Sequence, residues 1–153
     1  MAKSGKMRNF VDAKPSFMAF DFKKEYKEFY FPPAKPSLVD VPPMNYIAVR
    51  GKGNPNDEDG EYKATRKKKK DFSKVEFFHY EEGKCVQCMH IGSYDMEPTT
   101  IEKIKAFAAQ EGLSIAIDEN RRHHELYLSD PRKTVPDKLK TVIRYPVKST
   151  LHL

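Results

Sequence analysis

Apolar and polar residues follow two different periods along this chain, and the pattern is clearest after residue 71. Period-two alternation, with turn residues between the runs, predicts four strands, at 75–80, 85–91, 122–128 and 140–147. The turn at 81–84 predicts that the first two strands form a hairpin. One helix is predicted between the two strand pairs, with Thr99 in a capping box, Gly112 at its end and an apolar face of Ile101, Ile104, Phe107 and Ala108. This order predicts an α+β fold, an antiparallel sheet with helices on one face.

The first half has a weaker pattern. Partial helical spacing predicts a short amphipathic helix over 21–30, which Pro32, Pro33 and Pro36 end. Residues 44–51, preceded by 38–41, are apolar at both odd and even positions, which is typical of an interior strand. An acidic start at 57–59 predicts another helix through Thr65, but this helix has no apolar stripe.

Composition narrows the class of protein. The 153 residues include 28 Lys and Arg against 22 Asp and Glu, for a net charge of +6, and much of the excess lies in Arg66–Lys70. We interpret that run as a solvated surface rather than a nucleic-acid site, because no aromatic stacking platform or helix-turn-helix pattern accompanies it. The absence of an apolar leader or membrane-length segment, together with only two cysteines, predicts a cytoplasmic protein.

Two groups of residues suggest chemistry. Cys85 and Cys88 stand three apart on a predicted strand, so they point to opposite faces and are expected to pack rather than bind metal. Alternation places His123, Glu125 and Tyr127 on one strand face and the set at 124, 126 and 128 on the other, which we expect to be core.

The face with Glu125 has two interpretations. On pattern alone a solvent-facing polar surface is favoured, and the alternative is a concave site where Glu125 meets a ligand cation or acts as an acid or base. No third ligand at useful spacing supports a metal, and nothing in the sequence calls for a cofactor. Tyr94, in a loop before the helix, is either a packing residue or part of a pocket wall.

Three segments resemble the GyrI-like family. They are the strand and loop at 44–56, the strand and helix entry at 85–98, and the run HHELYLSDPR at 123–132. The third is the most specific and is similar to stand-alone members of that family. The resemblance covers about residues 21 to 148, with a gap.

The resemblance implies a duplicated strand-helix-strand-strand fold around a cleft that binds hydrophobic, often cationic, small molecules. The same module is the effector domain of multidrug-sensing transcription activators, and some stand-alone members are hydrolases that open the cyclopropane of DNA-alkylating natural products. Glu125 matches the position of the family's pocket carboxylate, with Tyr94 as a wall residue. Further ligand-binding candidates are Tyr46, Tyr127 and His123.

The chain departs from the family pattern where Thr65 meets Arg66, because the rest of the first helix and two strands are missing there. We therefore expect an N-terminal extension at 1–36, a truncated first unit at 37–65, an intact second unit at 66–148 and a tail at 149–153. Three functions stay open: a small-molecule-binding protein, a hydrolase of cyclopropane-containing electrophiles, and an inactive remnant. A homodimer is compatible with each.

Overall fold

A computed structural model describes residues 21–51 and 73–150 of the chain. The predicted helix at 57–65, the Arg66–Lys70 run and the Thr65–Arg66 junction lie outside these residues. The helical elements are α1 (Phe22–Glu25), α2 (Lys27–Tyr30), η1 (Tyr94–Met96), α4 (Glu97–Gln110) and η2 (Pro136–Lys138). The strands are β1 (Ser37–Val41), β2 (Met44–Val49), β3 (Val75–Tyr80), β4 (Gly83–Ile91), β5 (Leu113–Ile115), β6 (His124–Tyr127) and β7 (Lys140–Ser149).

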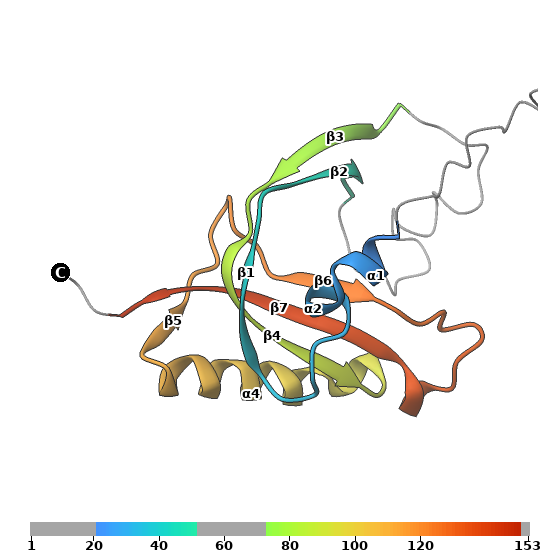
Figure 1. The fold of residues 1–153 in the computed structure, drawn as a ribbon. Coiled ribbons are helices and arrows are strands. Elements are labelled where there is room, and N and C mark those ends of the chain that lie inside the picture. Colours follow the sequence, from blue (N-terminus) through green and yellow to red (C-terminus); the bar gives the residue numbers. More distant parts are fainter. Residues whose placement is uncertain (1–20, 52–72, 151–153) are drawn as a thin grey trace, which may run out of the picture.

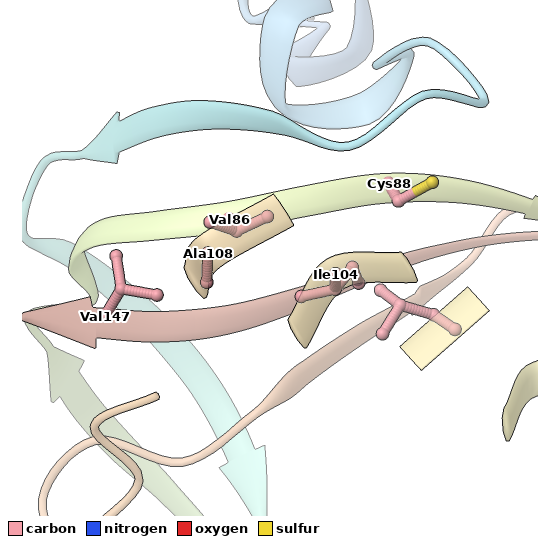
Figure 2. Close-up of a cluster of buried hydrophobic side chains, with 6 residues drawn as sticks. Val86, Cys88, Ile104, Ala108 and Val147 are labelled. Atoms are coloured by element: carbon pink, nitrogen blue, oxygen red, sulfur yellow. The ribbon is translucent and has the colours of Figure 1, made fainter. Parts of the chain in front are cut away.

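The main sheet is antiparallel, and helix α4 lies across one of its faces (Figure 1). Its strand order is β1-β4-β7-β5, with β6 also paired to β7. The helix packs its apolar stripe on the two central strands, and Figure 2 shows the resulting core of Val86, Cys88, Ile104, Ala108, Ile143 and Val147. The α+β fold class predicted from the sequence is therefore confirmed.

The predicted hairpin of residues 75–91 is wrong. β3 pairs with β2, whereas β4 pairs with β1, and both pairs share one continuous antiparallel register. Pro42 and Pro43 stand opposite Glu81 and Glu82 where the ladder breaks. Proline has no N–H to donate, so the ladder is interrupted there. The long ribbon made of β1 and β2 on one side and β3 and β4 on the other therefore bends at this point, and β3 does not fold back onto β4. The predicted turn at 81–84 is this bend, and Gly83 takes a φ of 62° in it.

The bend carries β2 and β3 away from the main sheet as a separate two-stranded sheet (Figure 1). The prediction of an interior strand at 44–51 is therefore wrong. Ile47 and Phe77 face each other across this pair and are 82% and 75% exposed. β2 is apolar at both odd and even positions because one of its faces is turned toward the main body, whereas the other face is apolar but uncovered.

The other local predictions hold with shifted boundaries. The helix predicted over 21–30 forms as two short turns, α1 and α2. Helix α4 begins at Glu97 rather than after Thr99, because Pro98 in the first turn suits a helix start. Cys85 and Cys88 are both buried and form no disulfide, as expected for packing residues. None of the helices formed by residues 21–51 and 73–150 is long and apolar enough to cross a membrane.

A buried ion pair fills the sheet face opposite α4. The Arg144 side chain on β7 and the Glu82 side chain before β4 are 2% and 1% exposed, and their Nη1 and Oε2 atoms lie 2.9 Å apart. Arg144 also donates to the Gln87 side chain and to the Phe29 carbonyl, and its guanidinium lies over the Phe29 ring. The pair therefore ties the N-terminal helix α2 to the centre of the sheet.

The ion pair gives the first prediction. Arg144→Met should lower the free energy of unfolding by about 3–5 kcal/mol, because it leaves Glu82 charged and buried without its partner. The double variant Glu82→Leu with Arg144→Met should lose less of the free energy of unfolding than Arg144→Met alone, because it leaves no unpaired buried charge. Urea unfolding followed by circular dichroism measures both.

Arg132→Met is the matched control, since Arg132 pairs with Asp130 at the surface. An Arg144→Met protein as stable as this control would contradict the role of the ion pair.

Candidate functional site: a carboxylate on strand β6

Strand β6 divides its side chains between the two faces of the sheet. Its register with β7 places Glu125 opposite Ile143 and Tyr127 opposite Thr141, on the face that α4 covers. His124 points to the opposite face, where its Nδ1 lies 3.3 Å from Oε1 of Glu82. The predicted alternation is therefore present, although His124 and Leu126 are half-buried rather than core residues.

Both oxygens of the Glu125 carboxylate have a neighbour two residues away, one just before β6 and one at its end. His123 Nε2 lies 3.5 Å from Oε1, and the Tyr127 hydroxyl donates to Oε2. The Glu125 side chain is 21% exposed. The carboxylate is thus partly withdrawn from water and held in one orientation.

Aromatic rings surround this carboxylate. The Tyr94 ring from η1 meets the Tyr127 ring edge-on, with centroids 5.4 Å apart. His123 stacks on Tyr145 of β7 at 5.6 Å. Of the predicted site residues, the structure thus brings four together: Tyr94, His123, Glu125 and Tyr127.

The neighbours of Glu125 favour its ionised form. The hydrogen bond from His123 lowers the pKa of Glu125, against the effect of partial burial, and Tyr127 adds to the lowering. The same contact with Glu125 raises the pKa of His123. The pKa of Tyr127 is raised by burial and by its bond to the carboxylate, so this hydroxyl remains a donor at neutral pH.

Tyr46 lies elsewhere, in an open groove on the other side of β6. The groove has a volume of about 1680 Å³ and runs between the bent-away sheet of β2 and β3 and the segment 119–124. Tyr46, His123 and His124 line it, whereas Glu125, Tyr94 and Tyr127 do not. His123 is the predicted residue that borders the groove and also contacts Glu125.

The Arg121 side chain and the Arg122 backbone hold one side of this groove. The guanidinium of Arg121 donates to the backbone carbonyls of Glu82 and Lys84, which fixes the bend of the ribbon. The Tyr80 hydroxyl bonds to the backbone of Arg122. The Tyr46 ring meets His124 edge-on, with centroids 6.2 Å apart.

The sequence did not predict a site role for several residues at these two places. Glu97 and Tyr145 adjoin the Glu125 cluster, and Glu82, Arg121 and His124 adjoin the groove. Their neighbours are distant in sequence, so no local spacing marks them. Glu97 falls within the segment 85–98 that resembles the GyrI-like family, which was the one available signal.

The chemistry available at Glu125 is that of an anionic group with aromatic neighbours. Such a group can attract an organic cation through charge and through the ring faces, or accept a proton from water. Within residues 21–51 and 73–150, no group of three or more His, Cys, Asp or Glu side chains is arranged to hold a metal ion.

Comparisons with known proteins agree with the fold. The model of the GyrI-like small molecule binding domain matches residues 70–148. A hydrolase from Listeria innocua is 31% identical with a TM-score of 0.73, and the match covers 84% of this chain and 99% of the other. An uncharacterized conserved protein from Listeria innocua is 29% identical with a TM-score of 0.74, over 84% and 99% of the two chains. A search of the curated proteins gave no match. The chain belongs to the GyrI-like family of small-molecule-binding domains.

Proposed function

We propose that the protein binds a hydrophobic organic cation, with the positive charge at Glu125. The observation that carries the proposal is the Glu125 carboxylate, kept ionised by His123 and Tyr127 and placed among aromatic rings. A partly desolvated charge attracts a counter-charge more strongly than one in bulk water. The family to which the chain belongs is described by small-molecule binding, which supports this class of ligand.

The arrangement also favours a cation over an anion or a neutral compound. The faces of tyrosine rings carry negative potential, and Tyr94, Tyr127 and Tyr145 stand around the carboxylate. A lipophilic cation gains from both the rings and the charge, whereas an anion would be repelled.

The test uses tetraphenylphosphonium as the cationic probe and triphenylphosphine oxide as a neutral analogue, with binding measured by calorimetry. Glu125→Gln should weaken binding of the cation by about tenfold or more, which corresponds to about 1.4 kcal/mol. The same substitution should leave binding of the neutral analogue nearly unchanged, because the size and shape of the side chain are kept and only its charge is lost.

Glu102→Gln is the matched control, since Glu102 is an exposed carboxylate on α4 that pairs with Lys105. If Glu102→Gln and Glu125→Gln weaken binding of the cation equally, the effect comes from the net charge of the protein and the proposal is wrong. If the wild-type protein binds neither probe and unfolds with low cooperativity, the inactive remnant is the better description.

A second function is a hydrolase of cyclopropane-containing electrophiles. Two Listeria innocua structures that match the chain, at 31% and 29% identity, are described as hydrolases. In such a reaction, Glu125 is a candidate base for water. The water oxygen bonds to a ring carbon, one strained C–C bond breaks, and its electron pair moves to an acceptor group that takes up the proton.

Mass spectrometry tests this activity directly. Incubation of a cyclopropane-containing alkylator with the wild-type protein should give a product heavier by one water, faster than in buffer alone. Glu125→Gln should reduce this rate at least about 100-fold, the usual contribution of a general base. Equal rates with protein and with buffer would exclude the hydrolase and leave a binding protein.

A further inference from the structure

Strands β2 and β3 turn an apolar face away from the body of the protein. Their register pairs Ile47 with Phe77 and Val49 with Val75 on this face. These four side chains are 82%, 75%, 50% and 38% exposed, in that order. Val75 and Phe77 do not line the groove on the other side of the ribbon. We call the four residues the outer face.

The two strands have little support from the rest of the molecule. Within the described residues, β2 and β3 pair only with each other, and the ribbon stands out from the main sheet (Figure 1). On its inner side the Tyr80 hydroxyl bonds to the Arg122 backbone and the Tyr46 ring meets His124, across an open groove. A two-stranded ribbon is marginally stable in water unless one of its faces is packed. Cover on the outer face would therefore stabilise it.

The composition of the outer face is that of the centre of an interface. Charged residues are 33% of the chain, yet none of the outward residues of β2 and β3 is Asp, Glu, Lys or Arg. The outward pair next to Ile47 and Phe77 is Asn45 with His79, whose Oδ1 and Nδ1 atoms lie 2.8 Å apart. Interfaces between proteins are depleted of charge at the centre and polar at the rim. The outer face thus has an apolar centre with a polar pair at one end.

The shape of the outer face favours a second copy of this chain as its partner. A row of large side chains, Ile47 and Phe77, lies beside a row of small ones, Val49 and Val75. A twofold axis that crosses the strands between these rows places the large row of each copy over the small row of the other. The two Asn45–His79 pairs then lie at opposite ends of the contact, outside its apolar centre. Sheets stacked face to face interdigitate in this way, and symmetric dimers use the same patch twice.

The segment that joins β2 to β3 has little to offer this face. Apart from glycine and proline, residues 50–74 include only Tyr62, Ala64 and Phe72 as apolar or aromatic residues, among many charges. The same apolar surface on another copy is a better chemical match, since neither side loses the hydration of a charge.

Charge and area limit the strength of such a contact. The net charge of +6 makes two copies repel each other, so apolar burial must drive association. The four side chains expose on the order of 400 Å². This is about half of the roughly 800 Å² that each partner contributes to a stable complex. A weak dimer is therefore expected, not a permanent one.

We infer that the protein forms a weak symmetric dimer in which the outer faces of two copies stack on each other. The inference is independent of cation binding at Glu125. Dimerisation converts each exposed ribbon into one layer of a two-layer sandwich. It also steadies the wall of the groove that Tyr46 lines, because β2 and β3 form that wall.

Sedimentation velocity of the full chain from about 2 to about 200 μM tests the dimer. The wild-type protein should change from monomer to dimer with a dissociation constant of about 10–100 μM. Ile47→Lys should weaken the dimer at least about tenfold, because it places an unpaired charge in the apolar centre. Phe77→Thr, which keeps a residue that favours strands, should act in the same direction. Circular dichroism checks that both variants fold.

Ile91→Lys is the matched control, since Ile91 is 52% exposed at the end of β4 and the added charge is the same. It should dimerise like wild type. Wild-type protein that stays monomeric throughout would overturn the inference. So would a dimer that Ile47→Lys and Phe77→Thr leave intact, or one that Ile91→Lys weakens as much as Ile47→Lys does.

Two further measurements separate this contact from other occupants of the face. Raising NaCl from about 50 to about 300 mM should tighten the dimer, because salt screens the repulsion between the two positive chains. A dimer that salt weakens would point to a charged interface elsewhere and overturn the inference. Hydrogen exchange of the β2 and β3 amides should slow as the wild-type concentration rises, but not in Ile47→Lys. Protection that is independent of concentration would show that the chain covers its own outer face, which also overturns the inference.

Discussion

The buried ion pair of Glu82 and Arg144 sets the orientation of strand β6 and, through it, of the site. Oε2 of Glu82 bonds to Arg144 and Oε1 faces His124 of β6. Successive residues of a strand point to opposite faces, so holding His124 on the ion-pair face sends Glu125 to the α4 face. A slip of one residue would put Glu125 beside Glu82, where two buried carboxylates would repel each other. The ion pair therefore specifies a register as well as tying α2 to the sheet.

A second constraint is the bend at Pro42 and Pro43. The continuous register of the ribbon shows that one long antiparallel pair is interrupted there, rather than two independent hairpins. The bend turns β2 and β3 out of the main sheet and opens the groove that Tyr46 lines. Arg121 holds the bend through the Glu82 and Lys84 carbonyls. The groove and the Glu125 cluster are thus placed by different constraints on opposite faces, with His123 between them.

The sequence allowed prediction of what local periodicity decides. Alternation along β6 was enough to place His123, Glu125 and Tyr127 together, and the helix pattern located α4 and its apolar stripe. The bend was not predictable in this way, because a Glu-Glu-Gly sequence is typical of a turn and the opposing prolines are about 40 residues away. Arg144 lies in an otherwise ordinary strand, so its burial depends on Glu82 and Gln87 from distant segments. Tyr46 resembled a site residue by motif, but β6 separates it from Glu125.

Glu97 shows how far the environment can alter a residue that local rules would call simple. A glutamate in the first turn of a helix is ordinarily stabilised as an anion by the helix dipole. Here that contribution, typically below about 1 kcal/mol at exposed sites, acts against burial and against the fixed charge of Glu125. The Thr141 hydroxyl, His90 and His123 oppose this rise in the pKa of Glu97 but do not reverse it. Because His123 and Tyr127 are already used by Glu125, the two carboxyl groups cannot share those partners. The donors in and next to β6 therefore favour the ionised form of Glu125 rather than that of Glu97.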